Sequence, residues 1–185
     1  MTQIAELWIP IVLSAVLVFV ASSIIHMLLK WHNSEYRRVP NEDAVRDAIR
    51  AGSAAPGQYA IPYCQDMKQM QSPEMLRKFT EGPVAFLVLR TPGPPKMGGF
   101  LVKWFVYGVV VAAIVACLAG GVLPAGAGRQ AGILTGAMAF LAYAGGSVPN
   151  AIWMGKPWSS ALKELLDALI YGLVTGATFA WLWPH

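Results

Sequence analysis

The chain has 185 residues and a formal net charge of +4, with 56% hydrophobic and only 13% charged residues. Soluble domains carry about 25% charged residues, so this composition excludes an ordinary soluble domain and indicates lipid as the main solvent. The basic residues gather beside apolar segments, where membrane topology requires them, and the net charge therefore does not indicate nucleic-acid binding.

Four apolar stretches are each about long enough to cross a bilayer. A helix rises about 1.5 Å per residue and the hydrocarbon core is about 30 Å thick, so roughly 20 apolar residues span it. The first stretch is expected to be a retained helix and not a cleaved signal peptide, because Met1–Leu7 has no Lys or Arg. We predict four transmembrane helices, at Ile9–Leu29, Phe100–Val122, Ala131–Trp153 and Ala161–Trp183.

The connection between the first two spans is too long and too patterned for a plain loop. Helix caps, acidic first turns and β-branched runs mark its elements. In chain order we predict a helix over Glu42–Ala51 begun by Asn41 and ended by Gly52, a strand over Gln58–Cys64, a helix begun by Ser72 and Pro73 that runs to about Thr80, a strand over Pro83–Arg90, and a stiff linker over Thr91–Gly99.

Two strands do not make a stable sheet alone. They can pack on the membrane face, pair with another copy, or pair with a different protein, and pairing in a symmetric dimer is our preferred expectation. The predicted fold is an all-α membrane protein: four transmembrane helices, with a small α+β cytoplasmic domain inserted between helices 1 and 2. Its divisions are residues 1–30, 31–98 and 99–185.

The positive charges predict the orientation in the membrane. Ten of the 14 Lys and Arg residues lie in the connection from Lys30 to Lys96, whereas the two chain ends outside the spans have none. The positive-inside rule places this connection in the cytoplasm and both termini outside. Indole rings prefer the headgroup level, and the seven tryptophans are predicted as interface anchors: Trp8, Trp181 and Trp183 at the outer ends, and Trp31, Trp104, Trp153 and Trp158 at the inner ends.

Polar residues gather at one predicted depth, the cytoplasmic interface. They are His26 and Lys30 at the end of span one, with His32 just beyond, Lys103 in span two, Asn150 in span three, and Glu164 and Asp167 three residues apart in span four. One interpretation is interfacial anchoring, in which Lys103 or Lys30 neutralises Glu164 or Asp167. The other is a wet cytoplasmic vestibule that binds an ion or a polar ligand.

Glycines suggest both a break and a packing surface. Gly145-Gly146 followed by Pro149 disfavours a straight helix at the inner end of span three. Such a break can line a cavity, as in transporters. The simpler interpretation, which we prefer, is that the helix ends near Ser147 and that residues 149–158 form an interfacial turn. The small-x-x-x-small pattern predicts helix packing, within the bundle or between copies, at Gly132 and Gly136 and at Gly172 and Gly176.

No cofactor or metal is predicted. Haem needs axial ligands and His26 is the only histidine inside a span, so a haem would require a second copy or subunit. His26, Lys30 and His32 cannot form a metal site together, since an ammonium group has no lone pair. His26 with Glu164 or Asp167 could hold a divalent ion, but the pattern is sparse. Cys64 and Cys117 lie at opposite predicted depths, and a disulfide between them is not expected.

The stretch PNAIWMGKPWSSALKELLDALIYGL (Pro149–Leu173), together with Val39–Val45 and Ser72–Val84, resembles small bacterial four-helix inner-membrane proteins. That family is uncharacterised, so the resemblance implies a location, the bacterial inner membrane, and carries over no activity, cofactor or catalytic residue.

Three classes of function remain open. The first, which we favour, is a non-enzymatic accessory, assembly or scaffold subunit acting through residues 31–98. The second is a small homo-oligomeric channel or transporter with a polar vestibule at the cytoplasmic interface. The third is a membrane-bound electron carrier or enzyme that uses His26 or Cys64. The expected partners are membrane lipid and either a second copy of the chain or another membrane protein, and no nucleic acid.

Overall fold

A computed structural model describes residues 4–185. The chain forms two compact units, which are described separately. The first unit contains the chain up to Tyr36 together with Lys96–His185, and the second is Arg37–Pro95.

The first unit is helical. Its elements are η1 (Ile4–Leu7), α1 (Trp8–Ser23), η2 (Ile24–Leu29), η3 (Trp31–Glu35), α5 (Met97–Val122), α6 (Gly128–Ala144), α7 (Ser147–Trp153) and α8 (Trp158–Leu182). Among the described residues, four helical segments are long and apolar enough to cross a membrane: Ala5–Leu29, Met97–Val122, Gly128–Trp153 and Trp158–Leu182. The four predicted spans are confirmed as apolar helices, and the chain has the composition of a multi-pass membrane protein.

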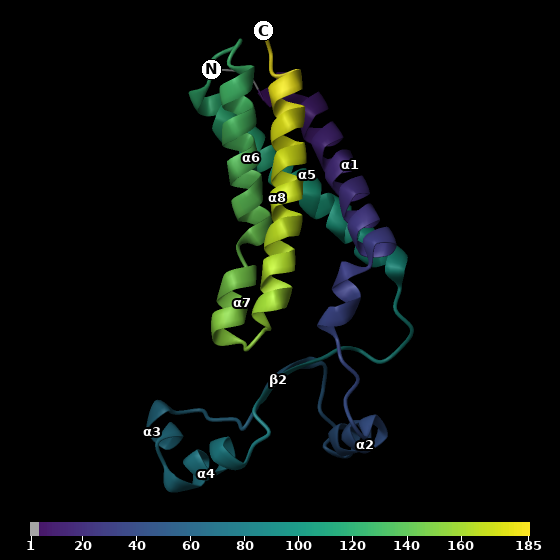
Figure 1. Cartoon of the computed structure of the whole chain (residues 1–185), viewed down its shortest axis with the longest axis vertical. Coiled ribbons are helices and arrows are strands. Elements are labelled where there is room, and N and C mark those ends of the chain that lie inside the picture. Colours follow the sequence, from purple (N-terminus) through teal and green to yellow (C-terminus); the bar gives the residue numbers. More distant parts are fainter. Residues whose placement is uncertain (1–3) are drawn as a thin grey trace. The chain divides into compact units, whose positions relative to one another are not determined.

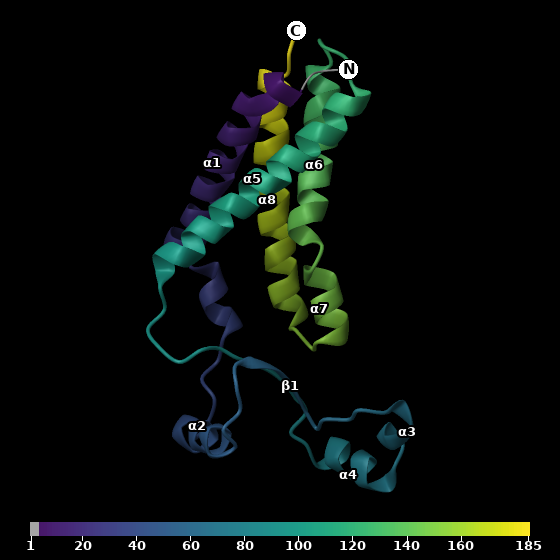
Figure 2. The same cartoon turned by 180° about the vertical axis from the view of Figure 1, so that it is seen from behind.

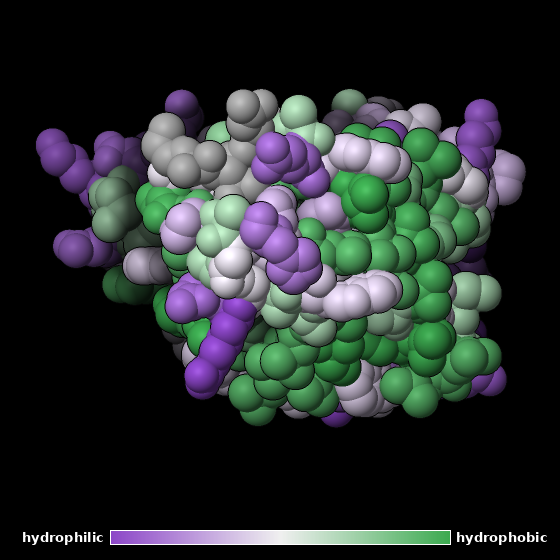
Figure 3. Space-filling model, turned by 90° about the horizontal axis from the view of Figure 1, so that it is seen from above, coloured by the Kyte–Doolittle hydropathy of each residue, from purple (hydrophilic) through white to green (hydrophobic). Residues whose placement is uncertain are grey.

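The helical unit carries large apolar side chains on its outside. Val110, Ile114 and Leu118 follow one face of α5 and are exposed, as are Leu141 on α6 and Leu173 on α8. Figure 3 shows how far such hydrophobic residues extend over the face seen from above. Soluble proteins rarely expose many large apolar side chains together on neighbouring helices. The exposed faces of these helices therefore fit contact with lipid.

Small residues allow α6 and α8 to lie side by side, as Figures 1 and 2 show from opposite directions. A Cβ added to Gly132 would lie 2.6 Å from the Cβ of Ala180, and one added to Gly176 would lie 2.6 Å from the Gly132 carbonyl oxygen. Gly136 and Gly172 also face each other's backbones. These four glycines therefore pack the two helices of one chain, the intramolecular one of the two expectations for them.

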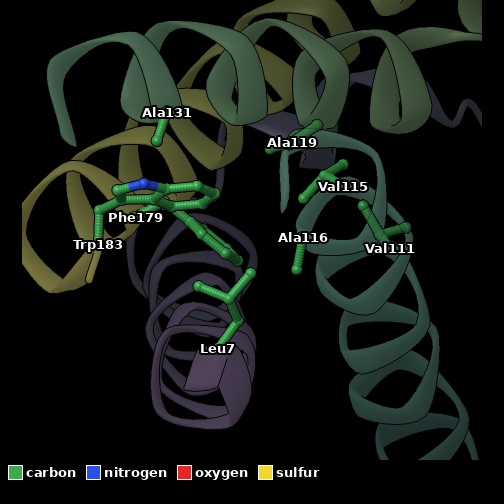
Figure 4. Close-up of a cluster of buried hydrophobic side chains, with 9 residues drawn as sticks. Leu7, Val111, Val115, Ala116, Ala119, Ala131, Phe179 and Trp183 are labelled. Atoms are coloured by element: carbon green, nitrogen blue, oxygen red, sulfur yellow. The ribbon is translucent and has the colours of Figure 1, made fainter. Parts of the chain in front are cut away.

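An apolar core joins η1, α5, α6 and α8 at the end of the unit where α1 begins and α8 ends (Figure 4). Its buried members are Leu7, Val111, Val115, Ala116, Ala119, Ala131, Ala139, Phe179 and Trp183. Alanines on α5 and α6 make room for the two aromatic rings, and this difference in side-chain size lets the helices interdigitate.

Span three is broken at Gly145-Gly146, and the helix resumes as α7. The preferred expectation, that the helix ends near Ser147 and residues 149–158 form a turn, is wrong, since helix continues to Trp153 and only residues 154–157 connect it to α8. Pro149 is tolerated because it is the third residue of α7, where no preceding turn needs its backbone N–H.

The second unit contains α2 (Glu42–Ala51), β1 (Gly57–Ile61), α3 (Met67–Met70), α4 (Pro73–Glu81) and β2 (Ala85–Leu89). The predicted bounds of α2 are confirmed, and Ser72 caps α4 by accepting a hydrogen bond from the Met75 backbone N–H. Asn41 is wrong as a side-chain cap: its backbone is left-handed, with φ 52°, and its side chain makes no capping bond.

The two strands pair with each other. They form an antiparallel ladder from Gly57 opposite Leu89 to Ile61 opposite Ala85. The backbone pairing of the strands is therefore made within the chain, because the 23 residues between Ile61 and Ala85 fold back through α3 and α4 and bring the strands together. That this two-stranded sheet packs on the membrane face, or pairs with another copy or a different protein, stays a prediction.

Candidate functional site

A sharp change of direction after α1 brings two histidines together. The α-helix gives way to a π-helical turn, η2, which contains His26, and Lys30 ends it in the left-handed conformation with φ 52°. The 3-10 turn η3 follows and carries His32. The imidazole rings of His26 and His32 are parallel within 2°, and their centroids lie 4.6 Å apart.

Lys163 attaches this turn to α8. Its ammonium group donates hydrogen bonds to the Trp31 carbonyl oxygen and to the Ser34 hydroxyl oxygen, both at 2.7 Å. Two protein oxygens thus hold the cation at the start of η3, and the turn is positioned against the first turns of α8.

The carboxyl group of Asp167, on α8, lies beside both histidine rings. Its Oδ2 lies 2.8 Å from Nε2 of His32 and 3.9 Å from Nε2 of His26. The other ring nitrogens also face oxygen: His32 Nδ1 lies 2.7 Å from Oε1 of Glu35, and His26 Nδ1 lies 3.0 Å from the Ser22 carbonyl oxygen. We call His26, His32 and Asp167 the histidine–aspartate cluster.

Burial makes this cluster unusual for a membrane protein. Asp167 is only 5% exposed, although it lies nine residues, or about 14 Å, into α8. Its second oxygen, Oδ1, is buried and has no hydrogen-bond partner among residues 4–185. A carboxyl with an unsatisfied oxygen is costly to bury, and one within a candidate membrane span is a functional-site hypothesis by default.

A cleft of about 890 Å³ opens beside the cluster. Its polar lining comes from several elements, with His26 on η2, Asn150 on α7, Lys156 before α8, and Glu164 and Asp167 on α8. Lys156 forms an ion pair with Glu164. Four aromatic side chains, Trp104, Tyr107, Tyr143 and Tyr171, complete the wall and contact one another at ring-centroid distances of 5.3–6.0 Å.

Four of the six polar residues predicted at the cytoplasmic interface lie together in the structure. His26, Asn150, Glu164 and Asp167 line the same cleft. Lys30 and Lys103 are exposed and, within the described part of the chain, pair with neither acid. The expectation that they neutralise Glu164 or Asp167 is therefore wrong.

Sequence reasoning missed the partners that hold this cluster. It named His32 as lying just beyond the span but gave it no partner in span four, and it did not place Glu35, Lys156 or Lys163 in the site. The spacing His32-x-x-Glu35 was a usable signal, because residues three apart stack on one side of a 3-10 turn.

The tryptophans divide into three groups by exposure. Trp8, Trp153, Trp158 and Trp181 are exposed, as an interface anchor must be. Trp183 is 2% exposed, and its indole N–H donates to the Pro124 carbonyl oxygen at 2.9 Å. Its prediction as a lipid-facing anchor is wrong, since the ring packs into the core. Trp31 and Trp104 are half-buried against the protein.

Cys64 and Cys117 are both free thiols. Comparison with known proteins adds no assignment, since no family model, curated protein or solved structure matches the chain. The resemblance to bacterial inner-membrane proteins stays a prediction, and the site has to be interpreted from its own chemistry.

Proposed function

We propose that the chain is a multi-pass membrane protein that binds a small cationic solute in the cleft beside Asp167, as the vestibule of a small channel or transporter. One observation carries the proposal: polar side chains from η2, α7 and α8 converge on a cleft inside a unit whose exterior is apolar. Interfacial anchoring would instead direct these side chains outward to the headgroups.

The charge of the lining favours a cation. Counted formally, with His26 neutral, the two carboxyl groups of Glu164 and Asp167 and the ammonium group of Lys156 give the lining a net charge of −1. A cleft of one sign with low-dielectric walls raises the local concentration of the opposite ion.

The break in span three supports the same conclusion. Gly146 and Ser147, on either side of the point where α7 begins, line the cleft. Irregular backbone at membrane depth is tolerated where it borders a cavity, because water can then satisfy the freed polar groups.

Cysteine accessibility tests whether the cleft is wet. In a Cys64→Ser, Cys117→Ser background, Ser22→Cys introduces a nearly isosteric thiol that lines the cleft. The controls are Val20→Cys and Ile24→Cys, which bracket it in depth and are exposed outside the cleft. A small charged thiosulfonate should modify Ser22→Cys in native membranes much faster than either control. Equal rates at all three positions would refute a water-filled cleft.

Flux measurements test the transport step. Proteoliposomes containing the wild type should admit K⁺ or Mn²⁺ faster than empty vesicles, and Glu164→Gln and Asp167→Asn should abolish the difference. Flux that survives both substitutions would remove the channel or transporter class.

A scaffold subunit that acts through Arg37–Pro95 is the second candidate. The observation that favours it is the exposed apolar face of β2, where Phe86 and Val88 alternate with half-buried neighbours and Val88 is 68% exposed. Native mass spectrometry after gentle extraction should then show a stoichiometric second protein that Val88→Ser releases and Tyr63→Ser, an exposed position outside the strands, retains. A homo-oligomer alone would contradict this candidate.

The membrane and the orientation are also proposals. The excess of Lys and Arg between the first two spans supports a cytoplasmic position for Arg37–Pro95 and an external position for both termini. A reporter fused after His185 in bacteria shows on which side of the membrane the C-terminus lies. We expect a signal from outside the cytoplasm, and a cytoplasmic signal would reverse the assignment.

A further inference from the structure

We infer that His26, His32 and Asp167 bind a divalent first-row transition metal ion, with Zn²⁺ as the reference case. The inference rests on the proposed function and deepens it, because it names the cation that the cleft takes. One potential ligand atom from each of the three residues lies within 4.8 Å of the other two.

Both imidazoles have the second hydrogen-bond partner that metal-binding histidines have. Metal-binding histidines almost always donate one ring N–H to a carboxylate or a backbone carbonyl, which leaves the lone pair of the other nitrogen for the metal. Here Nδ1 of His32 faces Glu35 and Nδ1 of His26 faces the Ser22 carbonyl, so Nε2 of each ring is the nitrogen that lies beside Asp167. Glu35 acts as a positioning residue through His32.

The two carboxylate contacts of His32 favour a positive charge, a proton or a metal ion, between its ring and Asp167. His32 has carboxylate oxygens on both nitrogens, at 2.7 and 2.8 Å, but a neutral imidazole has only one N–H. A doubly protonated His32 leaves the set with Glu35 and Asp167 at a net charge of −1. A divalent ion in place of the Nε2 proton brings the same set to zero, which a membrane interior favours.

The donor types select the class of metal. Two imidazoles and one carboxylate with open positions suit Zn²⁺ or another transition ion, whereas Mg²⁺ and Ca²⁺ prefer oxygen ligands. Asp167 Oδ1 is buried without a hydrogen-bond partner in the described part of the chain, and it is a second oxygen available to the ion or to a water bound to it.

Metal binding requires small movements of the three side chains. Tetrahedral coordination at bond lengths of about 2.0–2.2 Å places ligand atoms about 3.3 Å apart. His32 and Asp167 would separate slightly from 2.8 Å, and His26 would close from 3.9 Å and turn out of its parallel stack so that its ring plane contains the ion. The His26 side chain is 49% exposed and lies in a π-helical turn, so it has the freedom to move.

Metal binding is testable on the full chain in nanodiscs, in the Cys64→Ser, Cys117→Ser background so that thiolates do not compete. Equilibrium dialysis against Zn²⁺ should give one ion per chain. Co²⁺ in its place should show visible absorption typical of four or five ligands. Asp167→Asn and His32→Gln should lose the stoichiometric ion, while the matched controls Asp47→Asn and His185→Gln keep it.

Glu35→Gln separates a positioning role from a purely structural one. The amide oxygen can still accept from His32 Nδ1, so the fold stays intact by circular dichroism while the affinity for Zn²⁺ falls about 10–100-fold. Loss of the ion in a variant whose circular dichroism is unchanged supports the inference.

Zinc bound equally by the wild type and Asp167→Asn, or by neither, would overturn the metal site. If the wild type binds no ion while Ser22→Cys is still modified selectively, the metal assignment fails and the wet cleft stands. If one ion binds but Ser22→Cys reacts no faster than its controls, the metal site stands and the proposed function fails.

Discussion

The close approach of α6 and α8 makes Gly132→Ala a sharp test of the packing. An added Cβ at Gly132 would lie 2.6 Å from the Ala180 Cβ and 2.8 Å from the Gly176 carbonyl oxygen. Carbon atoms pack at about 3.5–4.0 Å, so the two helices must separate locally by about 1 Å. The atoms involved belong to backbone and to a Cβ, and neither can rotate away. Overpacking of this kind costs typically about 1–3 kcal/mol.

Gly121→Ala provides the matched control. Gly121 also lies in a candidate membrane span, α5, but a Cβ there would meet nothing within 4 Å among residues 4–185. Alanine is a better helix former than glycine by about 1 kcal/mol in water, and we expect this variant to be as stable as the wild type or more stable.

Unfolding by SDS in mixed micelles, followed by circular dichroism, measures both variants. Gly132→Ala should lower the free energy of unfolding by about 1–3 kcal/mol, while Gly121→Ala should not lower it. A Gly132→Ala protein as stable as the wild type would refute the contact between these helices. Destabilisation by both variants to the same extent would show that loss of glycine itself, and not the α6–α8 approach, is responsible.

Three further predictions concern the core and the second unit. Phe179→Ala should cost about 3–5 kcal/mol in the same SDS assay because its ring is fully buried, whereas Leu173→Ala, on an exposed face, should cost much less. Trp183→Phe should cost at least about 0.5–1.5 kcal/mol, since it removes one hydrogen bond and leaves a smaller ring in the core, and no loss would contradict the bond. The hydrogen bond and charge of Lys78 lower the pKa of Glu74, so its stabilising effect is present above the ordinary pKa and is lost as the pH falls through the lowered one. NMR titration of the Glu74 carboxyl in the full chain should show this lowered pKa, and Lys78→Gln should raise it.

Most of the local structure could be predicted from the sequence. The spans follow from the length of apolar runs, α2 from its acidic start and terminal glycine, and α4 from Ser72 and Pro73. Each of these signals acts within a few residues of the element that it specifies, and no distant contact needs to be known.

Features that depend on distant contacts could not be predicted. The pairing of β1 with β2 depends on how α3 and α4 fold between them. The burial of Trp183 depends on a carbonyl in the loop after α5 and on alanines of α5 and α6 that make space for the ring. Hydropathy places a tryptophan at a helix end correctly, but it does not distinguish a ring that faces lipid from one that faces a neighbouring helix.

The candidate site combines both kinds of information. The position of each residue along its predicted span placed His26, Glu164 and Asp167 at one depth. This part of the site could be predicted from the span boundaries alone. The choice of partner for Asp167 depended on the left-handed residue Lys30 and on Lys163, which together turn η3 back onto α8. A charge-pairing argument favours lysine for a buried carboxylate because lysine carries a fixed charge. The structure instead places imidazole beside Asp167. Imidazole can exchange its proton for a metal ion, and the metal site that we propose depends on this exchange.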